Sequence, residues 1–168
     1  MVFLPLDKIS FMENNELTDL LNDLIRINGD RVEGYEKAAK EVSSKNANLK
    51  MLFENKARQS RQYYGDLSSL VVAHNGRPSS GTTNAGKVYR TWMDVRASLT
   101  GNDSHSVLAS CEFGEDAALK AYQKALDSDI VLPDDVKQAI LKQKSALQSA
   151  HDEVKKYRDM FKSVGEHI

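Results

Sequence analysis

The scarcity of helix-breaking residues is the feature that most constrains how this chain can fold. Its 168 residues include only 3 prolines and 9 glycines. In the long segments between the breaks, apolar residues recur every three or four positions. That spacing places apolar side chains on one face of an α-helix, from which they can pack against other helices. The sequence therefore predicts an all-α protein built from long amphipathic helices rather than from strands and turns.

The order of helices and connections predicts how the helices are arranged. Short turns join the first helix to the second and the third to the fourth. About thirty residues, including a short helix over 87–99, join the second to the third. Two helical hairpins joined by one long crossover is the connectivity of ferritin-like four-helix bundles. We expect the four long helices over residues 14–42, 47–73, 105–127 and 134–162.

A single domain is expected, because a chain of 168 residues suits one hydrophobic core. We assign residues 14–163 to the four-helix bundle, 1–13 to an N-terminal arm and 164–168 to a C-terminal tail. The arm opens with MVFLPL, which is apolar but too short for a signal peptide, and charged residues follow it at once. We expect this arm to dock on its own bundle or on a second subunit.

Composition excludes several classes of function. The formal net charge is -1, so the chain lacks the basic field that nucleic-acid binding requires. No stretch approaches the roughly 20 apolar residues of a membrane span. The one cysteine, Cys111, cannot form an internal disulfide, which favours a reducing compartment. We therefore expect a cytoplasmic protein that binds neither nucleic acid nor membrane.

The segment CEFGEDAALKAY, residues 111–122, places carboxylates where a helix should be apolar. Glu115 falls on the apolar face, which also carries Cys111 and Tyr122, and Glu112 borders that face. Removing a carboxylate from water costs free energy unless another group pairs with it. The sequence therefore predicts that these two glutamates face either a metal ion or cations of the protein itself.

The metal-binding interpretation compares the chain with carboxylate-bridged di-metal bundles. Those bundles take a Glu from each of two helices and a Glu-x-x-His motif from each of the other two. Here the nearest match is Gln148-x-x-His151, and Glu54 has no histidine three residues later. This interpretation assigns iron, manganese or zinc to Glu112, Glu115 and His151, with help from Glu54 or Gln148.

The other interpretation, which we favour, is an internal polar network. Arg31, Lys56 and Arg58 belong to the first two expected helices and can reach inward to pair with the glutamates. Such a network fixes the register of the helices while adding little net stability. Three amides also fall near the apolar faces and can take part: Asn28, Gln59 and Gln143.

The most distinctive segments are LNDLIRINGDRVEGYEKAAKEV, KVYRTWMDVRASLTGND, LASCEFGEDAALKAYQKAL and QSAHDEVKKYRD. Within them, CE-x-GED-x-A-x-x-x-Y at 111–122 is the most specific pattern, followed by AHD at 150–152. Over about residues 17–161 the chain resembles a bacterial ferritin-like four-helix-bundle family of unknown function. The resemblance implies the ferritin-like fold and no particular activity. Members of that family tend to carry histidine where this chain has Tyr89, so one metal ligand is missing here.

These observations favour a non-catalytic ferritin-like bundle, a stress-associated or scaffold-like protein that acts through its surface or by self-association. Neither a Ser-His-Asp nor a Cys-His arrangement can be recognised from order or spacing, so we assign no catalytic residue and expect no cofactor. The alternative function is a degenerate metal-binding protein with oxidase or metal-storage activity. The partner that we expect is a second copy of the chain, contacted through the apolar arm or through Trp92.

Overall fold

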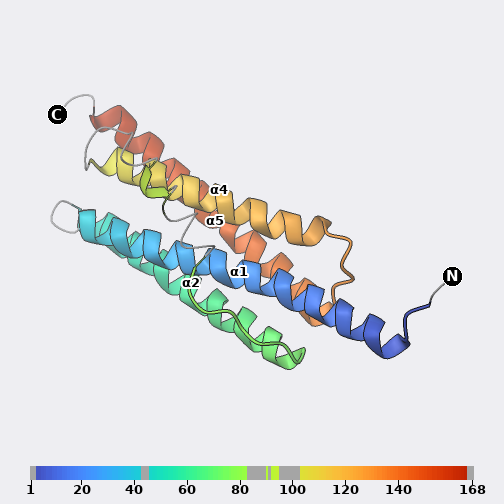
Figure 1. Ribbon diagram of the computed structural model, residues 1–168. Helices are drawn as coiled ribbons and strands as arrows, with labels where there is room; N and C mark the ends of the chain where they lie inside the picture. Colours follow the sequence, from blue (N-terminus) through green and yellow to red (C-terminus); the bar gives the residue numbers. More distant parts are fainter. Residues whose placement is uncertain (1–2, 43–45, 83–89, 91, 95–102, 166–168) are drawn as a thin grey trace.

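The computed structural model describes residues 3–42, 46–82, 90, 92–94 and 103–165. Four long helices lie lengthwise beside one another and make up nearly all of this part of the chain (Figure 1). They confirm the expected all-α architecture of two helical hairpins, with a short helical segment between them. The long helices are α1 (Leu6–Val42), α2 (Ala47–Ala73), α4 (Ser104–Asp127) and α5 (Asp134–Gly165).

Helix α1 begins at Leu6, so the expectation that it starts near Asn14 is wrong. The carbonyl of Pro5 accepts hydrogen bonds from the backbone amides of Lys8 at 3.0 Å and Ile9 at 3.1 Å. Pro5 therefore closes the first turn in the way that an N-cap residue does. Asparagine inside a helix is only about a few tenths of a kcal/mol less favourable than an average residue. Asn14 can therefore continue the helix instead of capping it.

Side chains cap the starts of α2 and α4. Asn46 accepts a hydrogen bond from the backbone amide of Leu49 at 3.1 Å. Asp103 accepts one from the amide of Ser106 at 2.7 Å. Each cap satisfies an amide that has no partner within the first turn of its helix. These caps fix where the second member of the first hairpin and the first member of the second hairpin begin.

The core consists of apolar side chains that the helices direct inward. One cluster centres on Leu21, Ile25 and Ile140, and the other on Phe53 and Leu108, and all five side chains are fully or almost fully buried. The helices are amphipathic, with charged residues on their outer faces. Accordingly, no helix in the described ranges has the length and apolar character that crossing a membrane requires.

Trp92 anchors the crossover between the two hairpins. Its indole is fully buried and packs edge-on against Tyr35, with ring centroids 5.5 Å apart. Two glycines make room for it. A Cβ atom at Gly34 of α1 would lie 2.5 Å from Cζ3 of the indole, and one at Gly114 of α4 would lie closer still. Because larger residues would clash here, these two glycines allow the crossover to pack against both hairpins.

Helices α2 and α5 pack against each other much less extensively than the other pairs of neighbouring helices do. A groove of about 780 Å³ lies between them and is lined in part by Gln59, Tyr63 and Gln143. Gln143 is buried, with 3% of its surface exposed. The groove therefore brings solvent close to polar side chains inside the bundle.

Candidate functional site

The carboxylate of Glu115 is fully buried inside the bundle, where it meets a guanidinium group. Nη2 of Arg31, from α1, donates a hydrogen bond to Oε1 of Glu115, from α4, at 2.7 Å. Both side chains are at most 1% exposed. The hydroxyl of Tyr35 donates a second hydrogen bond to the same oxygen. The prediction that a cation of the protein neutralises Glu115 is therefore confirmed.

Amides and a phenol extend this ion pair to all four long helices. Arg31 also donates hydrogen bonds to Gln59 of α2 at 3.3 Å and to Asn28 at 3.4 Å. Asn28 donates to the hydroxyl of Tyr122 at 2.9 Å, and that hydroxyl donates to Gln143 of α5 at 2.6 Å. The three predicted amides thus belong to the network. Its directional bonds fix how the helices are positioned relative to one another.

The two other predicted cations do not reach Glu115. Nζ of Lys56 pairs with Glu153 of α5 at 2.5 Å. Arg58 donates a hydrogen bond at 2.7 Å to Asn55, one helical turn earlier on the exposed surface of α2. Of the three candidates, Arg31 alone lies on a buried helix face. The prediction was therefore right about the type of partner and wrong about Lys56 and Arg58.

Burial fixes the protonation states in the network. Burial would lower the pKa of Arg31, but the hydrogen bond to Glu115 and the electrostatic interactions with Glu115, Tyr35 and Tyr122 together outweigh that effect, and the pKa is raised. Burial, reinforced by Glu115, raises the pKa of Tyr35 well above its usual value. Burial also raises the pKa of Tyr122. At neutral pH the guanidinium is therefore charged, and both phenols are neutral hydrogen-bond donors.

The ion pair is balanced in charge but incompletely hydrogen-bonded. Within the described residues, Oε2 of Glu115 and Nε of Arg31 are buried and have no hydrogen-bond partner. A buried polar atom without a partner costs about 1–3 kcal/mol. The network therefore specifies one arrangement of the helices more than it stabilises that arrangement.

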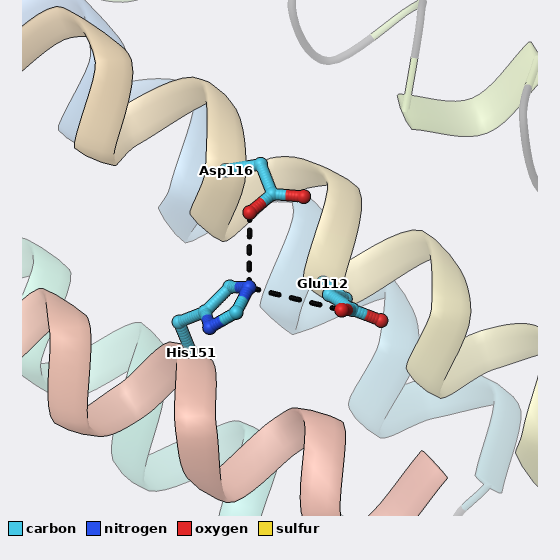
Figure 2. A group of neighbouring side chains, drawn as sticks. All are labelled: Glu112, Asp116 and His151. Atoms are coloured by element: carbon cyan, nitrogen blue, oxygen red, sulfur yellow. Dashed lines mark ion pairs between the residues drawn. The ribbon is translucent and has the colours of Figure 1, made fainter. Parts of the chain in front are cut away.

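A second group of polar side chains meets at the boundary between α4 and α5 (Figure 2). Nε2 of His151 lies 2.9 Å from Oδ1 of Asp116 and 3.7 Å from Oε1 of Glu112. One potential ligand atom from each residue lies within 4.8 Å of the other two. Glu112 and His151 are largely shielded from solvent, whereas Asp116 is exposed. We refer to Glu112, Asp116 and His151 as the boundary cluster.

The surroundings of the boundary cluster both support and oppose metal binding. Nδ1 of His151 lies 3.1 Å from Oδ1 of Asp152, and this hydrogen bond lowers the pKa of Asp152. A carboxylate on the far nitrogen orients a histidine for metal binding. However, Arg158 donates a hydrogen bond to Glu112 and so competes for that carboxylate. Gln148 donates to Asp152 at 3.0 Å and does not enter the cluster.

Of the five residues predicted to bind a metal, the structure brings together only Glu112 and His151. Glu115 instead points into the interior. Glu54 lies on the exposed side of α2, 3.8 Å from the amino group of Lys50. Helix geometry explains why the two glutamates of α4 separate. Residues three positions apart differ by about 60° around the helix axis, which places one in the core and the other at the boundary with α5.

Asp116 completes the boundary cluster, and sequence reasoning missed it. The available signal was its position four residues after Glu112, which puts both side chains on the same helix face. Glu115 was predicted as a ligand instead, because it lies on the apolar face of the helix. Two carboxylates and one imidazole are ligands that manganese, iron and zinc accept. The cluster can therefore supply three ligands to one divalent ion, with water completing the coordination.

The fold and these sites define an all-α four-helix-bundle protein with a buried ionic network and a carboxylate–histidine cluster at one helix boundary. The chain belongs to the family described as a domain of unknown function, DUF2383, whose model matches residues 16–128. That range contains both members of the Arg31–Glu115 ion pair but ends before His151. No curated protein matches the chain.

Proposed function

We propose that the protein is a non-catalytic bundle of the ferritin-like type that serves as a scaffold and acts through its surface. The Arg31–Glu115 ion pair carries this proposal. In ferritin-like di-metal bundles, inward-facing Glu and His side chains hold the ions. Here a permanently charged guanidinium already occupies the position beside Glu115, so the charge that would attract an ion there is neutralised.

The other members of the network also favour a structural role. Asn28, Tyr122 and Gln143 are neutral and satisfy one another through two hydrogen bonds, at 2.9 and 2.6 Å. Manganese, iron and zinc prefer carboxylate and imidazole ligands to amides and protonated phenols. A bundle filled in this way holds its helices in register and presents its surface to partners.

Metal analysis of the protein, purified without a chelating tag, tests the proposal. We expect the content of iron, manganese and zinc to be well below one ion per chain. We expect the same for Glu115→Gln, which keeps the size of the side chain. Glu112→Gln is the control that removes the boundary cluster instead. Stoichiometric metal that is lost in Glu115→Gln but retained in Glu112→Gln would overturn the proposal.

A second candidate function is the binding of one divalent cation by the boundary cluster. It is favoured by a specific observation, because two carboxylates face Nε2 of His151 while Asp152 orients the ring through Nδ1. The candidate ions are iron, manganese and zinc. Such a site suits metal binding or storage. The oxidase activity of a di-iron protein would require a second ion, which these three ligands do not provide for.

Calorimetric titration with manganese and zinc tests this second candidate. We expect Arg158→Ala to bind more tightly than the natural sequence, because it releases Glu112, and His151→Ala to lose binding. His74→Ala is a matched control, since within the described part of the chain Nε2 of His74 pairs with one carboxylate, that of Asp135, at 2.9 Å. If Arg158→Ala binds no more tightly than His151→Ala, the boundary cluster is not a metal site.

A further inference from the structure

The first three turns of α1 project past the ends of the other long helices (Figure 1). We call residues 6–16 the helical extension. Its apolar side chains face solvent, with Leu6 86%, Phe11 67%, Met12 53% and Ile9 37% exposed. The first buried residue of α1 is Leu17. An exposed apolar helix of this kind marks a surface that another protein element covers.

The helical extension cannot fold back onto its own bundle. It continues into the buried part of α1 without a break, and no glycine or proline occurs between Leu6 and Asn28. At 1.5 Å per residue, its 11 residues carry the apolar side chains up to about 16 Å beyond the first buried turn. No described part of the chain covers these side chains, so an element of another molecule is the candidate for covering them.

The apolar face of the extension is continuous with a face of α1 that packs inside the bundle. Leu6, Ile9 and Met12 follow one another at three-residue spacing, and steps of four lead from Met12 to Leu20 and Leu24. Residues at these spacings lie on the same side of a helix. Leu20 and Leu24 line a groove with α4, which ends at Asp127, so none of the described helices covers the same face over the extension.

A groove of matching length and character lies beside that face. It has a volume of about 660 Å³, runs between α1 and α4, and follows α1 from Glu16 to Ile27. At 1.5 Å per residue this stretch is about 18 Å long, close to the length of the extension. Small side chains on α4 leave room for a helix to approach. The apolar lining consists of Leu20, Leu24, Ile27, Ala117, Ala121, Ala125 and Ile130.

We propose that two copies of the chain exchange their helical extensions, each lying antiparallel to the partner's α1 in the groove between α1 and α4. One register satisfies the apolar face throughout. Leu6 lies opposite the partner's Ile27 and Ile9 opposite the partner's Leu24, and Met12 lies level with the partner's Leu21, next to the partner's Leu20. A two-fold dimer requires every contact to occur twice in reciprocal form. This register meets that condition, because its centre falls between Glu16 and Leu17.

The oligomeric state of the full chain tests the proposal. Sedimentation equilibrium across a micromolar to submillimolar concentration series should give twice the chain mass of 18.8 kDa. The double variant Ile9→Glu with Met12→Glu should give the single-chain mass and an unchanged helical circular dichroism spectrum. The control places the same two charges on α2, as Met51→Glu with Val72→Glu, at positions that are 62% and 61% exposed. This control should remain dimeric.

Mixing two defective variants tests whether the extension enters the groove. Ala121→Phe fills the groove from α4 and should also be monomeric. In a mixture, the intact extension of Ala121→Phe can enter the intact groove of the Ile9→Glu, Met12→Glu variant. One of the two exchanged contacts is then restored, and heterodimers should form. A monomeric natural chain, a dimeric extension variant, or a mixture without heterodimers would each overturn the proposal.

Discussion

Arg31 occupies a position where a charged side chain would be intolerable without its partners. It follows Leu24 and Asn28 and precedes Tyr35 on one buried face of α1. Glu115 neutralises its charge, and its Nη atoms donate hydrogen bonds to two amides as well as to that carboxylate. Removing one member of such a pair leaves an uncompensated buried charge, whereas removing both also removes the cost of desolvating them.

We therefore expect Glu115→Ala to lower the free energy of unfolding by about 3–5 kcal/mol. The double variant Arg31→Met with Glu115→Leu should have a free energy of unfolding that is at most about 2 kcal/mol below that of the natural chain, or higher than it. The reason is that apolar residues of similar volume replace the whole pair. Urea unfolding followed by circular dichroism measures both. Glu54→Ala is the control, since its exposed pairing with Lys50 contributes at most about 1 kcal/mol. Additive losses in the double variant would contradict this account.

Stability should fall at alkaline pH because of Tyr35 and Tyr122. Burial raises the pKa of both phenols in the folded protein. Their contribution is complete below the ordinary tyrosine pKa of about 10 and is lost as pH rises towards the folded values. Each tyrosine should steepen the decline by about 1.4 kcal/mol per pH unit above that value. Tyr35→Phe and Tyr122→Phe should each reduce the slope in urea unfolding measured from pH 8 to pH 11, and an unchanged slope would refute the assignment.

The sequence predicted the need of Glu115 for a partner, because a carboxylate interrupts an otherwise apolar helix face. It did not identify which cation would pair with Glu115. Arg31, Lys56 and Arg58 all lie on the first two expected helices, and the choice depends on how each helix is rotated about its axis. That rotation is set by packing with the other helices, which periodicity within one helix does not determine. The same uncertainty concealed Asp116.

At the scale of elements, the glycines of α1 and α4 decide how the crossover docks. Gly34 and Gly114 each face the indole of Trp92, whereas a Cβ atom at Gly65 of α2 would meet nothing within 4 Å. Glycine in a helix interior ordinarily costs about 0.5–1 kcal/mol relative to alanine. At the first two positions that cost is offset by the space that a large aromatic side chain occupies.

Replacing these glycines by alanine should therefore have opposite effects. Gly114→Ala should destabilise the protein by about 1–3 kcal/mol, the usual range for overpacking a core. Gly65→Ala should stabilise it by about 0.5–1 kcal/mol, because its site is open and helical. Combining Gly114→Ala with Trp92→Leu should cost less than the two single losses added together. Thermal unfolding measures all four variants, and equal effects of the two alanines would contradict the steric explanation.

Helices were the elements that the sequence predicted best. The apolar spacing from Leu17 onward corresponds to observed helix structure. The start of α1 was misplaced because residues 6–13 lie outside the core. Leu6, Ile9 and Met12 do recur at helical spacing, but their side chains are exposed, so the helical state of this segment depends on continuation from the packed part of α1. The expected short helix at 87–99 lies largely outside the described residues, which contain helix at 90 and 92–94.

At the scale of the whole molecule, the two hairpins join mainly through α1 and α4, while α2 and α5 remain apart around a groove. The buried network crosses this arrangement from α2 to α5 through Gln59, Arg31, Asn28, Tyr122 and Gln143. Direct packing therefore holds one side of the bundle, and hydrogen bonds contribute to holding the other. We therefore expect this arrangement to hold without a bound ion.

Removal of metal should therefore leave the stability of the whole protein unchanged. We expect the thermal midpoint in excess EDTA to match that in buffer within about 1 °C. An ion bound at 100 times its dissociation constant would contribute about 2.7 kcal/mol. That would shift the midpoint by roughly 5–11 °C in a chain of this size. Differential scanning calorimetry makes the comparison, and a loss of several degrees in EDTA would show that an ion supports the fold.

Trp92 is the only tryptophan in the chain, and its indole is enclosed by α1 and α4, which belong to different hairpins. Its fluorescence consequently reports on the interface between the two hairpins rather than on the structure of the whole protein. Any event that parts the hairpins would admit water to the indole and shift its emission to longer wavelengths. The protein thus contains an intrinsic optical probe at the junction on which its assembly depends.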